Sequence, residues 1–242
     1  MQTSKYLLRV ENIYGGYGNI EVIRDLTIYL NKDESIGLFG PNGHGKTTLF
    51  KIISGLLKPS KGKIIFYNED ITGLSPQHIV NNGLIHVPQS NILFPRMTVM
   101  EAFKLGAYSK RAWSELDKSL DQVFSIFPWV KNKLNQKCYS LSGGQRQMVS
   151  IGVGIMGRAK LLLLDEPTLG LSPIAKIDLL NSIIQLKKMN IPLVVIDQDV
   201  DFLTDSTDRL YLVERGSIKL EVNKNEMHKH KDKDILHMYF GK

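Results

Sequence analysis

Residues 40–47 have the types and spacing that bind phosphate groups. They read Gly-Pro-Asn-Gly-His-Gly-Lys-Thr, which is a pattern of spaced glycines followed by lysine and threonine. The stretch follows an apolar segment typical of a buried strand, 35–39, and precedes a helical pattern over 46–57, so its backbone N–H groups are expected to converge on β- and γ-phosphates. An ordinary glycine-rich turn is the alternative, and the full pattern in this context argues against it. The expected nucleotide contacts here are Gly40, Pro41, Asn42, Gly43, His44, Gly45, Lys46, Thr47 and Thr48.

Three side chains of this loop have different expected roles. Lys46 adds a point charge beside the phosphates, and Thr47 offers a hydroxyl group to Mg²⁺. His44 occupies a variable position of the pattern, and we interpret it as a bystander rather than a catalyst.

An acidic pair follows a second apolar segment, the four leucines 161–164. Asp165 and Glu166 stand at the end of this expected strand, which is where open α/β sheets bind their ligands. Successive strand residues point to opposite sides, so we expect Asp165 to reach the Mg²⁺ shell while Glu166 orients and deprotonates a water molecule. By itself an acidic pair at a strand end is more often a solvated turn. Downstream of a phosphate loop, we interpret it as a Walker B pair.

A second glycine-rich segment, Leu-Ser-Gly-Gly-Gln at 141–145, opens a helical pattern that begins at Arg146. It predicts a second helix N-terminus with exposed amides and a serine hydroxyl. One nucleotide needs only one primary cradle, so a second chain must supply the other half if the two cradles cannot meet within one chain. An ordinary helix capped by Ser142 would not explain the whole pentapeptide.

The elements that position these motifs alternate between strand and helix, which indicates an α/β crossover fold. The runs 161–164 and 193–196 are typical of a parallel sheet buried on both faces, with a helix over 173–189 between them. Residues 6–30 alternate like antiparallel strands. Further expected elements are strands at 63–67 and 84–87, a short helix between Ser75-Pro76 and Gly83, and a hairpin over 210–222.

The stretch 91–139 differs, because it holds two helical patterns and no clear strand. Thr98 to Glu101 form a capping box, and an apolar face follows Ser114. We interpret the stretch as a helical insertion that, with the start of the next helix, spans about residues 91–150 of a single domain covering 1–242.

Composition excludes several classes of protein. The chain has 242 residues, of which 43% are hydrophobic and 23% charged, so it is expected to be globular rather than disordered or fibrous. Its longest purely apolar run is far shorter than the roughly 20 residues that span a bilayer, and its first residues lack the apolar region of a secretion signal. The net charge of +7 favours an anionic partner, but no aromatic and basic pattern predicts nucleic acid.

Two minor features receive structural interpretations. Cys138 lacks neighbours at metal-ligand spacing and is expected to be a packing residue. The charged tail contains His228 and His230, which lack a third ligand and fit a solvated helix or turn.

Residues 141–145 match the signature of ATP-binding cassette (ABC) transporter ATPases, and the other motifs follow in that family's order along nearly the whole chain. The resemblance implies a P-loop NTPase fold with a RecA-like parallel-sheet core, an N-terminal antiparallel β subdomain and an inserted helical subdomain. It implies ATP and Mg²⁺ as cofactors. In such proteins two ATPase subunits enclose two ATP molecules. The residues that would touch the partner's nucleotide are Ser142, Gly143, Gly144 and Gln145.

The resemblance also implies roles for two isolated residues and for the helical subdomain. Tyr17 matches the aromatic that stacks on adenine, and Gln89 matches the Q-loop residue that contacts Mg²⁺ and links the site to the membrane partner. The helical subdomain would dock on a membrane permease. The chain would then lie at the cytoplasmic face of the membrane, with a solute-binding protein as an indirect partner.

Two departures from the family pattern narrow the resemblance. Gln198 stands at the switch position, where most members have histidine, and Ser172 stands where the D-loop usually ends in aspartate. Together with 94–99 and 238–241, these residues resemble the LivF-type ATPases of branched-chain amino acid importers, or relatives that serve urea and amides. A carboxamide can donate a hydrogen bond to the γ-phosphate but cannot take a charge, so we expect hydrolysis to survive, with Glu166, Gln198 and Lys46 as the catalytic set.

Two alternatives stay open at this point. A lipid or lipopolysaccharide exporter ATPase shares the motifs but is expected to have histidine at the position of Gln198. A regulatory module that binds ATP and scarcely hydrolyses it is disfavoured by the intact Lys46, Asp165 and Glu166. In such transporters the permease and its binding protein choose the cargo, and the resemblance favours a pair of this chain with a paralogous ATPase over a pair of two copies.

Overall fold

The computed structural model describes residues 5–89 and 93–223. The histidines of the charged tail and the apolar ending at 238–241 lie outside the described residues, as does the expected start of the helical insertion at Asn91. Among the described residues, no helix is both long enough and apolar enough to cross a membrane.

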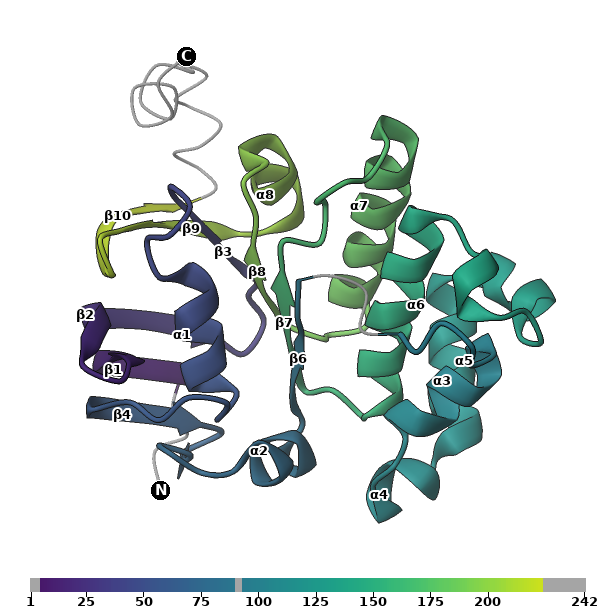
Figure 1. Cartoon of the computed structure of the whole chain (residues 1–242), viewed down its shortest axis with the longest axis horizontal. Coiled ribbons are helices and arrows are strands. Elements are labelled where there is room, and N and C mark those ends of the chain that lie inside the picture. The colour runs from purple at the N-terminus through teal and green to yellow at the C-terminus, as the bar shows by residue number, and fades with distance from the viewer. Residues whose placement is uncertain (1–4, 90–92, 224–242) are drawn as a thin grey trace.

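A six-stranded sheet forms the centre of the molecule (Figure 1), and its strand order is β10-β9-β3-β8-β7-β6. Strands β3, β8, β7 and β6 run parallel to one another, and β9 runs parallel to β3, whereas β10 pairs antiparallel with β9. Each parallel strand is short and almost entirely buried, as expected for a sheet covered on both faces. The bounds are β3 Ile36–Phe39, β6 Leu84–Val87, β7 Leu161–Asp165, β8 Leu193–Ile196, β9 Arg209–Glu214 and β10 Ser217–Asn223.

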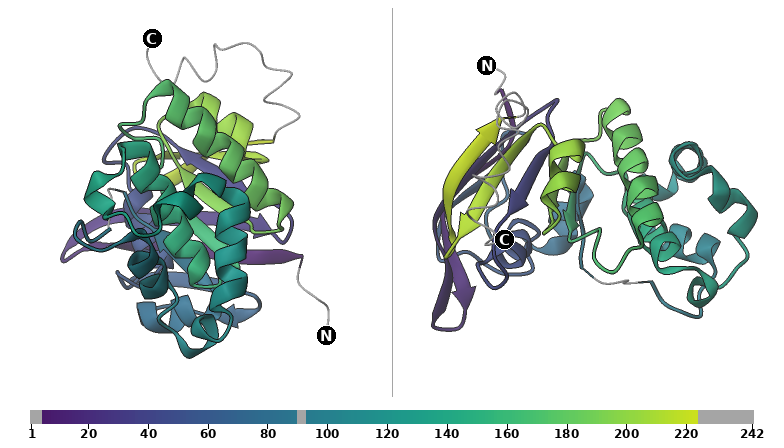
Figure 2. Two further views of the ribbon diagram at one scale, coloured as in Figure 1. Left: turned by 90° about the vertical axis from the view of Figure 1, so that its right-hand side faces the viewer. Right: turned by 90° about the horizontal axis from the view of Figure 1, so that it is seen from above.

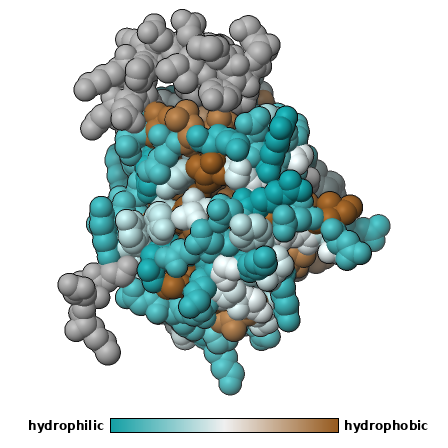
Figure 3. All heavy atoms as spheres, turned by 90° about the vertical axis from the view of Figure 1, so that its left-hand side faces the viewer, coloured by the Kyte–Doolittle hydropathy of each residue, from teal (hydrophilic) through white to brown (hydrophobic). Residues whose placement is uncertain are grey.

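A second, antiparallel sheet lies on one side of the first, with strand order β2-β1-β4-β5. The predicted alternation over 6–30 is confirmed, because β1 (Tyr6–Tyr17) and β2 (Ile20–Asn31) pair antiparallel. One hydrophobic cluster joins this sheet to the parallel sheet through helix α1 (Lys46–Ile53). The outer face on this side of the molecule is largely hydrophilic (Figure 3). The remaining strands are β4 Lys61–Phe66 and β5 Glu69–Asp70.

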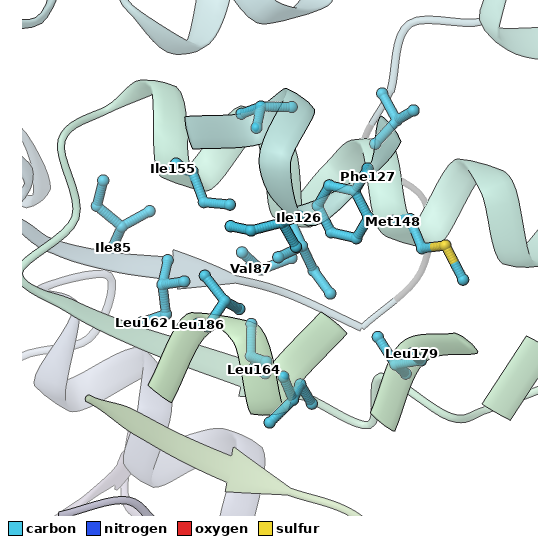
Figure 4. Packing of buried hydrophobic residues seen from close by; sticks show 14 of the residues in the cluster. Ile85, Val87, Ile126, Phe127, Met148, Ile155, Leu162, Leu164, Leu179 and Leu186 are labelled. Carbon is cyan, nitrogen blue, oxygen red and sulfur yellow. The ribbon is translucent and has the colours of Figure 1, made fainter. Parts of the chain in front are cut away.

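Helices cover the other side of the parallel sheet (Figure 2) and enclose a second hydrophobic cluster. Figure 4 shows Val87, Leu162 and Leu164 from the sheet packing against residues from the helices, such as Ile155 and Leu186. These helices are α3 Val99–Gly106, α4 Lys110–Trp113, α5 Leu116–Ile126, α6 Gly143–Met156 and α7 Pro173–Lys188, and the 3₁₀ turns are η1 Pro128–Lys133 and η2 Cys138–Ser140.

Local sequence signals account for most helix ends. Thr98 and Glu101 form the predicted capping box of α3, with both reciprocal hydrogen bonds present. Ser75 caps α2 (Pro76–Asn82), and Gly83 ends it in the left-handed conformation, as predicted. Between residues 93 and 139 the structure has helices and 3₁₀ turns and no strand, so the predicted helical character is confirmed. The buried position of Cys138 is confirmed as well.

Three predicted boundaries were wrong. The helix expected to reach residue 57 ends at Ile53, because Gly55 adopts a positive φ of 74° and the chain turns there, leaving Leu56 exposed. The helix expected to begin at Arg146 begins at Gly143. Ser142 and Gln145 form a capping box there, which lets the helix start within the glycine-rich segment. The strand expected at 63–67 is β4, which begins earlier, at Lys61. Within the described part of the chain, the helix nearest the C-terminus is α8, Val200–Ser206.

The turn between β9 and β10 ties the two sheets together. The Gly216 carbonyl accepts a hydrogen bond from the N–H of Arg24 in β2 at 2.9 Å. A Cβ at Gly216 would lie 2.0 Å from the Val22 carbonyl oxygen, and its φ is +81°. Only glycine fits this close approach.

We predict that Gly216→Ala lowers the free energy of unfolding by about 3 kcal/mol, because the new Cβ must both adopt a left-handed conformation and displace backbone. Gly73→Ala is the matched control, since Gly73 has a φ of +67° and nothing within 4 Å of its Cβ position. The control should lose only about 1 kcal/mol. Urea unfolding compares the two, and equal losses would contradict the proposed tie between the sheets.

Candidate nucleotide site

The phosphate loop connects the carboxyl end of β3 to the N-terminus of α1 and requires glycine at defined points. Gly40 has a φ of +140°, and a Cβ there would lie 2.1 Å from the carbonyl oxygen of Val213 in β9. Gly45 is the N-cap of α1 and is left-handed, with no side chain to cap the helix. The first backbone N–H groups of α1 are therefore left for an anion.

The Lys46 ammonium is folded back onto its own loop. Its Nζ donates hydrogen bonds to the carbonyl oxygens of Gly40 at 2.6 Å and Pro41 at 2.9 Å. Lys46 is 5% exposed, and burial lowers the pKa of its ammonium, an effect that the nearby carboxylates Glu166 and Asp165 oppose. A cation buried in this way is stabilised by any phosphate placed in the loop.

His44 has a structural partner that the sequence did not indicate. Its Nδ1 accepts a hydrogen bond from the backbone N–H of Arg215 at 3.2 Å, and its carbonyl oxygen accepts one from the N–H of Gly216 at 3.1 Å. The phosphate loop is thus held to the β9–β10 turn. These two contacts are structural, and the bystander role of His44 in catalysis stays a prediction.

Asp165 ends β7 in a buried position with one free oxygen. Its Oδ1 accepts a hydrogen bond from Thr47 Oγ1 at 3.2 Å, while Oδ2 is buried and has no partner among the described residues. Burial is the main cause that raises the pKa of Asp165 to about 6. A buried carboxylate oxygen without a donor, next to a threonine hydroxyl, suits a hard cation such as Mg²⁺.

Glu166 is held by two carboxamides. Gln89 Nε2, after β6, donates to Glu166 Oε2 at 2.8 Å, and Gln198 Nε2, after β8, donates to Glu166 Oε1 at 3.1 Å. Glu166 directly follows β7 and has a positive φ of 45°. Three neighbouring strand ends therefore meet at one carboxylate.

Asp197 is a site residue that the sequence reading did not identify. Its carboxylate is 2% exposed and accepts four hydrogen bonds, two from Thr168 and two from the backbone N–H groups of Gln198 and Asp199, at 2.7 to 3.1 Å. These bonds fix the backbone of Gln198 to the loop after Glu166. The available signal was an aspartate directly after a fully apolar strand.

A cavity of about 410 Å³ adjoins these groups. It brings together predicted residues from the phosphate loop, the acidic pair, the Q-loop and the switch position. Leu169, which was not predicted, also lines it. The lining is Asn42, Gly43, Gly45, Lys46, Thr47, Thr48, Gln89, Glu166, Leu169 and Gln198.

Several predicted contacts lie outside this lining: Gly40, Pro41, His44 and Asp165 beside it, and Tyr17 and the segment 142–145 elsewhere in the chain. Tyr17 is 45% exposed near α1, where its hydroxyl accepts a hydrogen bond from Lys51 Nζ at 3.1 Å. The segment 142–145 forms the N-terminus of α6. There the Gln145 Oε1 atom accepts a hydrogen bond from the backbone N–H of Ser142 at 3.2 Å. A Cβ at Gly143 would meet no atom within 4 Å. The structure therefore leaves this second helix N-terminus open and away from the phosphate loop's cavity.

Comparisons with known proteins show which family this chain is similar to. The family model described as ABC transporter matches residues 23–169. The chain is 32% identical over 212 residues to the high-affinity branched-chain amino acid transport ATP-binding protein BraG of Pseudomonas aeruginosa, covering 88% of this chain and 91% of that protein. It is 32% identical over 217 residues to the lipopolysaccharide export system ATP-binding protein LptB of Haemophilus influenzae, covering 88% of each.

A solved structure is similar to this chain over almost its whole length. The ADP conformation of MJ1267, an ATP-binding cassette of an ABC transporter, superposes with a TM-score of 0.84 at 28% identity, covering 99% of this chain and 100% of that one. The chain belongs to the ABC transporter family. It binds and hydrolyses ATP as that family's ATPase subunit, and the predicted P-loop NTPase fold is confirmed.

The raised pKa of Asp165 predicts a pH dependence of stability in the absence of Mg²⁺. Its pKa is about 6 in the folded chain against 3.8 ordinarily, so the folded state binds more protons between those values. The free energy of unfolding then falls as pH rises through this window. Asp165→Asn should remove that fall and be about 2–3 kcal/mol more stable than the original chain at pH 7.

Urea unfolding in a chelator at several pH values between about 4 and 7 measures this difference. Asp178→Asn, which removes an exposed carboxylate in α7, is the control and should keep the original pH dependence. An unchanged dependence of stability on pH in Asp165→Asn would contradict the account of a buried carboxylate with one unpaired oxygen.

Proposed function

We propose that Glu166 is the general base of ATP hydrolysis, with Lys46 and Gln198 contacting the γ-phosphate. The observation that carries this proposal is the position of Glu166 at the cavity beside the phosphate loop, with both carboxylate oxygens hydrogen bonded. A base held within hydrogen-bond reach of an attacking water typically contributes about 10²- to 10⁴-fold to the rate.

Mg²⁺ is held in this proposal by Thr47 and Asp165, with Gln89 as a third contact. The free Oδ2 atom of Asp165 supports it. When bound, Mg²⁺ neutralises charge on the β- and γ-phosphates. Gln89 and Gln198 donate to Glu166 in this structure, and both amides must turn toward nucleotide or metal to take their proposed roles. Glu166 would then be released toward water.

The whole chain acts, in our proposal, as one ATPase domain with a helical subdomain at about 91–150. A second ATPase subunit, either a paralogue or a second copy, supplies the other half of each site. The open N-terminus of α6 supports this, because Ser142, Gly143, Gly144 and Gln145 contribute nothing to the cavity of their own chain. Tyr17 stacks on adenine in the proposed complex.

The transport reaction that this ATPase drives is, we propose, uptake of branched-chain amino acids. The similarity to BraG supports it, and so does Gln198 at the switch position. The similarity to LptB favours lipopolysaccharide export as a second candidate, for which histidine is expected at position 198. In either case the chain is a peripheral subunit at the cytoplasmic face, bound to membrane permeases, and an importer would add a solute-binding protein.

Glu166→Gln should lower the rate of ATP hydrolysis by at least about 100-fold while leaving ATP binding intact, because the amide cannot accept a proton. The variant should accumulate as an ATP-bound dimer, which size-exclusion chromatography with ATP detects. Gln198→His is the comparison variant and should retain activity within about tenfold. Robust phosphate release by Glu166→Gln would reject the assigned base.

The transport assignment is tested by crosslinking in native membranes with this chain as bait. We expect hydrophobic permeases, a second ATPase and a solute-binding protein that binds branched-chain amino acids, identified by mass spectrometry. Recovery of a lipopolysaccharide export assembly, or of no membrane protein, would overturn the import assignment and leave the ATPase chemistry intact.

A further inference from the structure

A second cavity, of about 290 Å³, lies at the opposite edge of the parallel sheet from the phosphate loop. Lys160 directly precedes β7 and Ile191 lies just before β8, so the cavity is at the amino ends of these strands. The phosphate loop follows the carboxyl end of β3, which runs parallel to β8. In Figure 1 the amino edge is at the bottom, where α2 and α4 lie. The two cavities share no lining residue.

The walls of this cavity are strongly basic. Four cationic side chains line it, and its lining contains no aspartate or glutamate. Glu115 forms an ion pair with Arg158 and lies 3.6 Å from Lys118 Nζ. Within residues 5–89 and 93–223 it is the one carboxylate paired with any of the four cations, which leaves an excess of positive charge. The four cations are Arg111, Lys118, Arg158 and Lys160.

The same cavity has an aromatic and apolar part. Tyr67 is 47% exposed, and the Nζ atom of Lys160 lies 5.1 Å from the centroid of its ring. Ile155, Met189 and Ile191 complete the apolar lining. A flat or apolar group can therefore lie beside the cations, and burial of such a group adds affinity that a simple anion would not gain.

The segments around the cavity come from different parts of the fold. Arg111 lies on α4 and Lys118 on α5, within the helical stretch 93–139. Arg158 and Lys160 lie on the loop before β7, and Tyr67 follows β4. Arg158 has a positive φ of 61°, and the Lys160 N–H donates to the Gly83 carbonyl at 2.7 Å. A ligand here would contact the helical stretch 93–139 and residues next to both sheets at once.

We propose that this cavity binds a phosphorylated small molecule that carries a flat or apolar group, such as a nucleoside monophosphate. The cations hold the phosphate by charge-assisted hydrogen bonds, and Tyr67 with the aliphatic lining takes the remaining group. The site is separate from the nucleotide site and does not depend on which solute is transported.

The test is titration of AMP into the full chain whose phosphate loop is saturated with Mg²⁺ and ADP, followed by calorimetry. We expect one additional AMP bound per chain, and inorganic phosphate should compete at least about tenfold less well than AMP. Lys160→Gln and Arg111→Gln should each weaken AMP binding about tenfold, since each removes a charge-assisted contact.

The matched control is Lys219→Gln, which removes an exposed positive charge on β10 outside the cavity. It should bind AMP within about twofold of the original chain. All three variants should keep their ADP affinity, which shows that they fold. The proposal is overturned if the ADP-saturated chain binds no further AMP, if the cavity variants bind it like the control, or if phosphate competes as well as AMP.

Discussion

Strand β8 sets the geometry on which the nucleotide site depends. It pairs parallel with β3 on one side and with β7 on the other, and strands in a sheet lie about 4.8 Å apart, so the phosphate loop and the acidic pair start about 10 Å apart. That gap is bridged by side chains, as Thr47 Oγ1 and Asp165 Oδ1 show at 3.2 Å. All four residues of β8 are buried aliphatics, which fixes the strand firmly between its neighbours.

The second constraint is the burial of charge at this edge. Lys46, Asp165 and Asp197 are each at most 5% exposed, and a buried charge is costly unless it is paired. Asp197 has four donors, and Lys46 has two carbonyl oxygens, whereas Asp165 keeps one oxygen without a partner. In our account a phosphorylated nucleotide with Mg²⁺ satisfies these groups better than the protein does alone, so binding energy is concentrated at the reacting phosphates.

Much of this arrangement could be predicted from the sequence, because the strongest signals are local. The glycine and lysine spacing, the acidic pair after four leucines and the capping box at Thr98 depend on neighbours in the chain. The sequence could not show what depends on distant contacts. The partnership of His44 with Arg215 spans 171 positions, and Glu166 meets two amides from other strand ends only after the sheet has formed.

The helix boundaries that were wrong have a different explanation, which is local to the chain. A glycine at a positive φ ends α1 before its apolar pattern does, and a capping box begins α6 within a glycine-rich stretch. Periodicity alone measures neither effect. The role of Asp197 was missed because it acts through Thr168, 29 residues away, and the amino acid types alone do not reveal that pairing.

The most direct test of the central claim is a crystal structure of the full chain with a non-hydrolysable ATP analogue and Mn²⁺ in place of Mg²⁺, with the metal located by its anomalous scattering. Our account predicts the metal between Thr47 and Asp165, and Lys46 Nζ moved from the Gly40 and Pro41 carbonyls to the phosphates. A metal without contact to Asp165, or a Lys46 that stays on those carbonyls with nucleotide bound, would contradict it.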